Sequence, residues 1–326
     1  MNGRKADEDR IRAILDKQKT KLGFARRWWP KYLFRFDNIE AAASILNNGK
    51  LLSRSAAQAR GLIVRDCASS DIIAATAQQY RQCVRLYFRP KTPMQYSNEG
   101  VRPATSIERG AHCPVPVVLL FDAMSVLGRA TTRFSNGNLA VRGTEVGSDA
   151  DFFEKIPFDL VYHDGVTPPL ETRKIVFQRH AEVIVPTELD LAPLKFVVCR
   201  SPAEQESLLY LLDARARDRW SKVTVTKSNM HNRKWNFVEQ VDLVEHRLIF
   251  RFNRSYTSAG PFDAAVTIDG LESGNKYLWR DETYRLPDAA TLRLKMPRTE
   301  ARVRAEVRLD GALVYKNELS QSSEPI

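Results

Sequence analysis

The sequence contains little cysteine and no long hydrophobic run. Its 326 residues include four cysteines, which form no CxxC pair and have no histidine at zinc-ligand spacing, so neither a disulfide framework nor a structural zinc site is expected. No apolar run approaches the roughly 20 residues that a membrane-spanning helix needs. Residues 1–21 mix both charges and lack the apolar stretch of a secretion signal. The sequence therefore predicts a soluble, cytoplasmic protein with reduced cysteines and no membrane partner.

Common nucleotide-binding and hydrolase motifs are missing as well. The chain has no GxxxxGKS/T or GxGxxG loop, and no HExxH or GxSxG motif. His163 and His180 have no serine or cysteine nucleophile in a recognisable context, so no catalytic triad is expected. Any chemistry must therefore depend on scattered polar residues at strand ends, without a metal.

The charge that is present is mostly positive. Fifty Lys+Arg against 39 Asp+Glu give a net charge of +11, with an isoelectric point near 9.5. Phosphates attract such a surplus through counterion release, which favours nucleic acid as the partner. The alternative is that the charge only keeps the chain soluble, and composition does not decide between the two.

Hydrophobic patterning predicts an α+β core followed by a small antiparallel β-sandwich. We expect a basic N-terminal helix in residues 1–24, a core domain in residues 25–222 and an accessory β-sandwich in residues 223–326, where alternating runs are punctuated by glycine. Within the core, strands are expected over residues 32–36, 84–88, 115–121, 181–186 and 194–199, and helices over residues 38–46 and 203–219.

Four segments resemble conserved blocks of the DarT family of nucleic-acid ADP-ribosyltransferase toxins. They are YLFRFDNIEAAASILNNGKLL from residue 32, LYFRPKTPMQY from residue 86, FSNGN from residue 134 and QRHAEVIV from residue 178. The blocks follow the family's order and cover roughly residues 30–220. The resemblance implies a split β core of the ADP-ribosyltransferase type with NAD as the substrate.

The resemblance makes Glu182 the candidate catalytic acid. Transfer of ADP-ribose breaks the nicotinamide N-glycosidic bond of NAD through a transition state with positive charge on the ribose, which a nearby carboxylate stabilises. Glu182 is a lone acid in the strand-like segment AEVIVP, and it could also help to deprotonate the acceptor base. The alternative interpretation is a polar residue that points outward from an edge strand.

The resemblance also assigns residues to NAD and to the acceptor. Arg35 and Asp37, which stand where the family usually has His and Thr, would hold NAD together with Tyr87 and Tyr96. Arg65 would be the arginine that serves both NAD and the acceptor base, with Arg81 as its rival. The remaining candidates, for contact with the target base and the nucleic-acid backbone, are Asn138, Arg89 and Lys91, with Arg85 in the same basic cluster.

Together these residues predict an NAD-dependent ADP-ribosyltransferase that modifies a nucleobase of single-stranded nucleic acid. The resemblance favours DNA, with RNA second, and implies a bacterial toxin or phage-defence effector with a cognate antitoxin. Two alternatives stay open: an inactive nucleic-acid-binding module, and a transferase that acts on proteins. The modified base, the role of the β-sandwich and the oligomeric state are not determined by the sequence.

Overall fold

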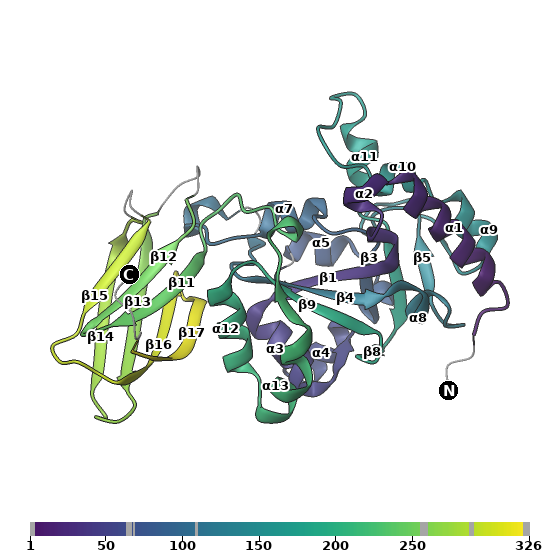
Figure 1. Cartoon of the computed structure of the whole chain (residues 1–326). Coiled ribbons are helices and arrows are strands. Elements are labelled where there is room, and N and C mark those ends of the chain that lie inside the picture. Colours follow the sequence, from purple (N-terminus) through teal and green to yellow (C-terminus); the bar gives the residue numbers. More distant parts are fainter. Residues whose placement is uncertain are drawn as a thin grey trace.

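The computed structural model describes residues 4–62, 67, 69–107, 110–254, 260–286 and 290–321. Arg65, one of the predicted catalytic residues, lies outside these ranges. The chain forms an eight-stranded sheet surrounded by helices, followed by two further antiparallel sheets at one end of the molecule (Figure 1). This confirms the predicted α+β class and the predicted C-terminal β-sandwich.

The predicted N-terminal helix is present but interrupted. Helix α1 spans Glu8–Lys21 and α2 spans Gly23–Arg26, followed by the short helix η1 at Trp29–Lys31. The break falls at Gly23, whose φ of 65° is left-handed and is readily adopted by glycine. Ile11 and Leu15 of α1 and Trp29 of η1 are buried in the core, so this segment is packed against the domain.

The main sheet has the order β10-β9-β4-β1-β3-β7-β5-β6. Its strands are β1 (Tyr32–Asn38), β3 (Cys83–Tyr87), β4 (Pro116–Asp122), β5 (Arg133–Ser135), β6 (Val146–Gly147), β7 (Glu182–Pro186), β9 (Leu194–Cys199) and β10 (Thr224–Thr226). All pairs are antiparallel except β9 with β10. A separate small pair joins β2 (Lys50–Leu52) to β8 (Glu188–Asp190).

The sheet divides between β1 and β3. Strand β1 pairs with β4 along its whole length, but it meets β3 at a single position, Phe34 opposite Tyr87. Beyond that position the two strands separate, so the residues that follow on β1 face an opening instead of a neighbouring strand. This division is the split core that the sequence predicted.

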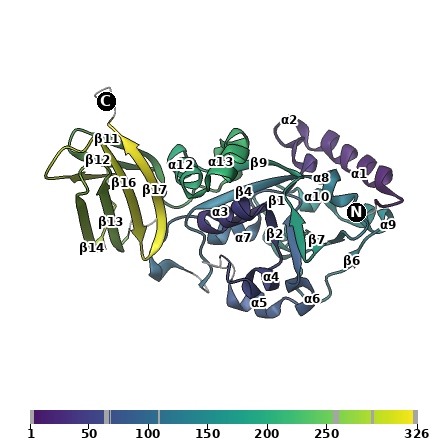
Figure 2. The same cartoon turned by 90° about the horizontal axis from the view of Figure 1, so that it is seen from below.

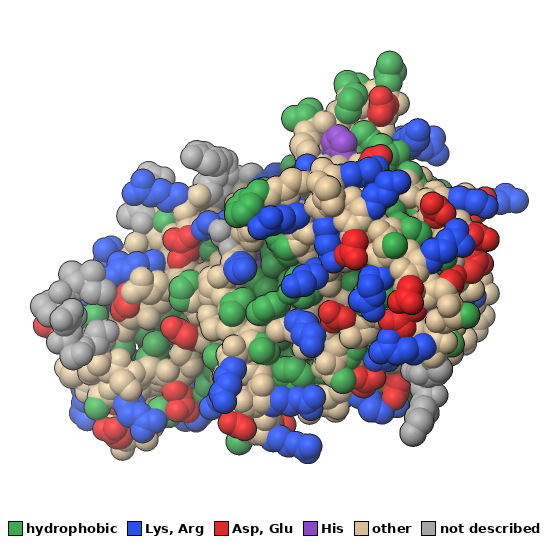
Figure 3. Space-filling model, turned by 45° about the vertical axis from the view of Figure 1, so that its right-hand side comes forward, with side chains coloured by type: hydrophobic (Ala, Val, Ile, Leu, Met, Phe, Trp, Pro, Cys, Tyr) green, Lys and Arg blue, Asp and Glu red, His purple; other side chains and the backbone are tan. Residues whose placement is uncertain are grey.

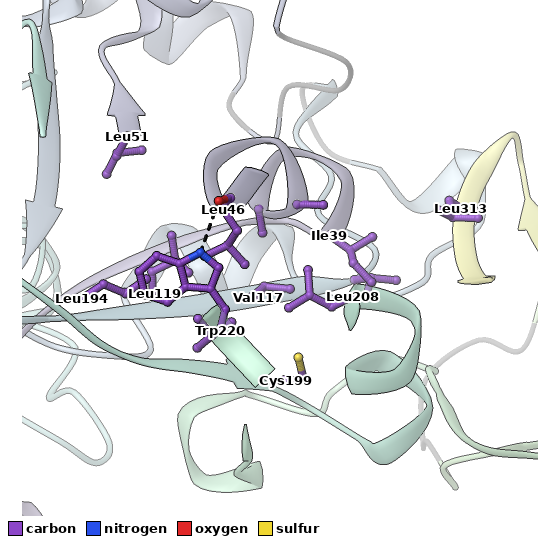
Figure 4. Close-up of a cluster of buried hydrophobic side chains, with 14 of the residues drawn as sticks. Ile39, Leu46, Leu51, Val117, Leu119, Leu194, Cys199, Leu208, Trp220 and Leu313 are labelled. Carbon is purple, nitrogen blue, oxygen red and sulfur yellow. Dashed lines mark hydrogen bonds between the residues drawn. The ribbon is translucent and has the colours of Figure 1, made fainter. Parts of the chain in front are cut away.

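Helices cover one face of the main sheet near its β4 side. Helices α3 (Ile39–Asn48), α12 (Pro202–Leu211) and α13 (Ala214–Trp220) pack around Val117, Leu119 and Cys199 of the sheet (Figures 2 and 4). The indole Nε1 of Trp220 donates to the Leu46 carbonyl at 3.2 Å, which joins α13 to the end of α3. The other helices are α4 (Arg54–Ala59), α5 (Ser70–Ala75), α6 (Gln78–Arg81), α7 (Pro93–Asn98), α8 (Ala123–Leu127), α9 (Ala150–Lys155), α10 (Phe158–Val161) and α11 (Thr172–Gln178).

The C-terminal sheets face each other as a sandwich. One has the order β11-β12-β15 and the other β14-β13-β16-β17, and the rings of Phe250 and Tyr315 meet between them at 5.8 Å. Their strands are β11 (Val238–Val244), β12 (Arg247–Phe252), β13 (Phe262–Gly270), β14 (Lys276–Tyr284), β15 (Thr291–Lys295), β16 (Arg302–Leu309) and β17 (Ala312–Ser320). Because β10 still pairs with β9 in the main sheet, we propose a domain boundary just before β11, somewhat later than residue 222.

The positive charge belongs to the first part of the chain. Residues 1–236 contain 37 Lys+Arg against 25 Asp+Glu, whereas residues 237–326 contain 13 against 14. The sandwich is therefore close to neutral, and an anionic partner would be attracted to the core. Figure 3 shows Lys and Arg side chains spread over one face of the molecule, with hydrophobic side chains between them. No helix in the described part of the chain is long and apolar enough to span a bilayer.

Candidate active site

A hollow of about 1240 Å³, its open mouth included, lies where β1 and β3 separate. Helix α3, strand β2, helices α4 to α6 and the start of α7 also contribute to its wall. The charged residues that line it are Arg35, Lys50, Arg54, Arg81 and Arg85 on the basic side and Asp37 on the acidic side. Because the cations outnumber the carboxylate among the described lining residues, the hollow favours an anionic ligand.

Arg35 bridges the opening between the separated strands. Its Nε and Nη2 donate to the two Asp37 carboxylate oxygens at 2.8 and 2.7 Å, and its Nη1 donates to the Arg85 carbonyl at 3.4 Å. That carbonyl belongs to β3, where the strand has no β1 partner. The two predicted NAD-binding residues are thus paired with each other, so Asp37 holds the guanidinium in place beside the hollow.

Glu182 begins β7 directly opposite Tyr87 of β3. It is 2% exposed, and its Oε2 lies 3.4 Å from the Arg85 Nε without a hydrogen-bond partner among the described groups. Since β7 lies between β3 and β5, the interpretation of an outward-facing residue on an edge strand is wrong. Glu182 is not among the residues that line the hollow, but its neighbours Arg85 and Tyr87 are.

The surroundings of Glu182 act on its protonation in two directions. Burial raises the pKa of Glu182 above its ordinary value, while the Arg85 guanidinium, the Leu139 backbone amide and Arg35 favour the charged form. Shifted carboxyl pKa values of this kind are typical of functional sites. Burial is thus the stronger influence on Glu182, and Arg85 is the main group that opposes it.

Tyr87 supplies an aromatic wall next to Glu182. It is buried, its ring stacks on Phe36 at 6.5 Å with an angle of 21° between the planes, and its hydroxyl lies 3.8 Å from the Met94 sulfur. Burial, followed by the charge of Glu182, raises the pKa of Tyr87 above its ordinary value. The phenol is therefore neutral at physiological pH and presents an uncharged ring to the hollow.

The loop between β5 and β6 carries Asn138 next to Leu139, whose backbone amide lies near Glu182. The adjacent Leu139 supplies the amide that favours the charged Glu182. The Asn138 side chain, however, accepts a hydrogen bond from the Ala140 amide at 3.0 Å within its own turn. Its role toward a target base stays a prediction.

Arg89 is not the surface cation that its sequence context suggests. It is 2% exposed, its guanidinium donates to the carbonyls of Pro90, at 3.0 Å, and of His163, and it lies 5.1 Å from the Trp29 ring. Burial, followed by Arg179, lowers the pKa of Arg89 to about 10. These contacts give it a structural role in joining the loop after β3 to the chain near His163.

Lys91 and His180 stabilise the same loop in different ways. Lys91 has a left-handed φ of 53°, and its amide donates to the Gln95 Oε1 at 3.0 Å. His180 accepts from the Met94 amide at 3.2 Å through Nε2, and its Nδ1 lies 2.9 Å from the Val176 carbonyl. Burial lowers the pKa of His180 to about 4, so this histidine is neutral and positions α7.

Tyr96 lies outside the hollow. It is 52% exposed on α7, whereas Met94 at the start of that helix lines the cavity. Arg81, the rival of Arg65, does line the hollow, as do Leu62 and Cys67, the nearest described residues on either side of Arg65. The structure thus brings together Arg35, Asp37, Tyr87 and Glu182 and places Tyr96 and Arg89 elsewhere.

The sequence alone does not predict the contact between Arg85 and Glu182. Its pattern indicates only that Arg85 belongs to a basic cluster. A usable signal was available, because Arg85 and Tyr87 are two residues apart and therefore share one face of β3.

A divided antiparallel sheet thus places Arg35 and Tyr87 on the wall of a hollow that favours an anionic ligand, with the buried Glu182 beside Arg85 and Tyr87. The sequence model of DarT, described as an ssDNA thymidine ADP-ribosyltransferase, matches residues 34–236. The chain belongs to the DarT family. The predicted family and the predicted enzyme class, an NAD-using ADP-ribosyltransferase, are confirmed. The described residues include no group of three or more metal-ligating side chains.

Among the similar solved structures, one reaches a TM-score of 0.50 and shows the fold of the core at low sequence identity. Thermus sp. 2.9 DarT in complex with ADP-ribosylated ssDNA has a TM-score of 0.50 and 15% identity, over 62% of this chain and 96% of that chain. The same Thermus protein with NAD+ has a TM-score of 0.48 and 15% identity, over 62% and 98%. Thermosipho africanus DarTG with ADP-ribose has a TM-score of 0.47 and 14% identity, over 65% and 53%. No match was found among curated proteins.

Proposed function

We propose that this protein transfers ADP-ribose from NAD to a nucleobase of single-stranded DNA. The bond between the ribose C1′ and the nicotinamide nitrogen breaks, and its electron pair stays on that nitrogen, so neutral nicotinamide leaves. A ring nitrogen of the base forms a new bond to C1′ and loses its proton. The DarT family description supports thymidine as the acceptor.

The observation that carries this proposal is the position of Glu182. A buried carboxylate next to the hollow, with one oxygen that has no hydrogen-bond partner, can accept a hydrogen bond from the ribose and stabilise the charge that develops on it. In its charged form it can also take the proton of the base. Arg35 and the neighbouring cations would hold the pyrophosphate, and Tyr87 would face the nicotinamide ring.

Labelled NAD tests the acceptor directly. The protein is incubated with NAD carrying label in the adenylate part, together with separate pools of single-stranded DNA, RNA and protein. We expect label in the DNA pool, in a product that nuclease removes. Label in RNA or protein alone would contradict the proposed acceptor, and oligonucleotide binding without nicotinamide release would indicate an inactive binding module.

Arg85→Met tests the electrostatic control of Glu182. Removing the cation that lies 3.4 Å from the carboxylate should raise the pKa of Glu182 further. Because the charged carboxylate is the active form, the rate is lost as the pH falls through this pKa, and the acidic limb of the profile should move to higher pH by about 1 unit. Single-turnover nicotinamide release measures the profile. Arg85→Lys should stay close to the native profile, and an unmoved limb in Arg85→Met would refute this control.

The biological role is also part of this proposal. Modification of DNA bases would make the protein toxic to its own cell, and we propose a toxin or defence effector in the cytoplasm with an antitoxin partner. One solved relative, from Thermosipho africanus, is a DarTG protein. Toxicity on expression that Glu182→Gln abolishes would support a role as a toxin, and equal toxicity of the two forms would contradict it.

A further inference from the structure

A cluster of aromatic and cationic side chains lies outside the hollow, at the junction of the core and the sandwich. We call Tyr96, Lys234 and Trp235 the junction platform. The Lys234 Nζ lies 5.1 Å from the Tyr96 ring centroid and 5.6 Å from the Trp235 ring centroid. The Arg102 guanidinium also lies 5.4 Å from the Trp235 ring centroid. Such cation–π pairs hold the rings and the charges in a defined arrangement.

The backbone before Lys234 is fixed by a buried carboxylate. Glu99 is 2% exposed, and it accepts from the backbone amides of Asn232 and Arg233 at 2.9 Å each. Arg233 itself has a left-handed φ of 54°. Burying a carboxylate is costly unless it is hydrogen-bonded, so these hydrogen bonds favour the turn that leads into Lys234 and Trp235.

Both parts of the chain are needed to place Trp235. Gly100 of the core leaves room for it, since a Cβ at this glycine would lie 2.5 Å from the Trp235 Cβ. Asn253, which follows β12, donates through Nδ2 to the Trp235 carbonyl at 3.2 Å. The extra sheets therefore help to define a surface that the core alone would not complete.

The platform is connected to the hollow by helix α7. Met94 in the first turn of α7 lines the hollow, whereas Tyr96, two residues later, points to a different side of the helix and is 52% exposed. A helix with its side chains is about 10 Å across. A single strand with one base at the hollow can therefore cross α7 and reach the platform with a neighbouring nucleotide.

We propose that the junction platform binds a nucleotide next to the modified one, with its base stacked on Tyr96 and its phosphate at Lys234. This inference rests on the proposed function. Proteins hold single strands by combining aromatic stacking with a basic groove, and the core that carries the platform also carries the positive surplus. Half of Tyr96 faces solvent, so its ring is accessible to a base.

The test uses the full-length protein and a fluorescent single-stranded DNA 12-mer of mixed sequence, without NAD. Tyr96→Ala should weaken binding about 5- to 100-fold, the range for loss of one stacked base. Tyr96→Phe, which keeps the ring, should bind like the native protein. Lys234→Gln should reduce the salt dependence of binding by about one unit of slope, the effect of one lost phosphate contact. Lys276→Gln, an exposed lysine on the edge strand β14, is the matched control and should change neither quantity.

Nicotinamide release and label transfer are measured on the same proteins. If native protein labels DNA but Tyr96→Ala and Lys234→Gln bind the 12-mer like Lys276→Gln, the platform does not contact the strand and this inference is wrong, while the proposed function stands. If native protein labels no DNA, the proposed function is wrong. If Tyr96→Ala then also binds the 12-mer as tightly as the native protein does, the inference is wrong as well. Native nicotinamide release with a raised DNA KM in Tyr96→Ala is the supporting result.

Discussion

Glu182→Gln is expected to reduce ADP-ribose transfer by about 10³-fold or more while DNA binding stays intact. The carboxylate acts on charge that develops only in the transition state, and groups of this kind typically contribute 10² to 10⁴ in rate. The amide keeps the size of the side chain but carries no negative charge. Nicotinamide release and label transfer at saturating NAD measure the loss, and titration with the fluorescent 12-mer measures the binding.

The same substitution should make the protein more stable. Glu182 is a buried carboxylate, and its Oε2 has no hydrogen-bond partner among the described groups, so glutamine should raise Tm by roughly 2–4 °C, or about 1 kcal/mol. The folded-state pKa of Glu182 is raised, so the cost of its charge is present above this pKa and disappears as the pH falls through it. The difference in Tm between Glu182→Gln and the native protein should therefore become smaller as the pH falls.

Glu171→Gln provides the matched control for a carboxylate. Glu171 is exposed at the start of α11, and its replacement should change neither activity nor Tm. Retention of at least a tenth of the native rate in Glu182→Gln would mean that another group stabilises the ribose. The assignment of the catalytic acid would then be wrong.

Arg200→Met should destabilise the fold by about 3–5 kcal/mol. The side chain of Arg200 is fully buried, its Nε lies 3.1 and 3.2 Å from the two Glu204 oxygens, and its Nη2 donates to the Pro114 carbonyl at 2.8 Å. It also lies 3.9 Å from Glu99, the residue that fixes the junction platform. Removing the cation leaves two buried carboxylates without their charge partner.

Thermal unfolding tests this prediction, with a fall in Tm of roughly 10 °C expected. Burial already raises the pKa of Glu204, and Arg200 opposes that rise. Without the arginine, the folded-state carboxyls favour the protonated form more strongly, so the deficit of the variant should shrink as the pH falls. Arg215→Met, at an exposed position on α13, should change Tm by no more than about 1–2 °C. Equal Tm values for the two variants would show that the buried cluster is not structurally important.

The sequence predicted those features that depend on neighbouring residues. The alternation in AEVIVP indicates a strand that contains Glu182, and β7 is found there. Arg35 and Asp37, two residues apart on one strand, share a face for the same reason. Whether β7 lies inside the sheet or at its edge is set by its pairing with β3 and β5, whose residues are far away in the sequence.

The difference between local pattern and long-range pairing also explains why the positions of Arg89 and Tyr96 differ from the prediction. Arg89 and Tyr96 occupy the block that resembles the family, and their residue types suit binding of nucleic acid and of NAD. Burial of Arg89 follows from carbonyls more than 70 residues away, at Val161 and His163. Tyr96 is directed away from the hollow by the short helix α7 and meets Lys234 from the far end of the core.

Local sequence therefore determined the class of this protein, its motifs and the likeness of its core to the DarT family, because strand periodicity and motif spacing are properties of short segments. Tertiary structure alone decided which charges meet. The separation of β1 from β3, the contact of Arg85 with Glu182 and the junction platform all depend on pairing between distant segments, which no local pattern encodes. The sequence indicates which residues could take part in the chemistry, and the tertiary structure determines how they are arranged.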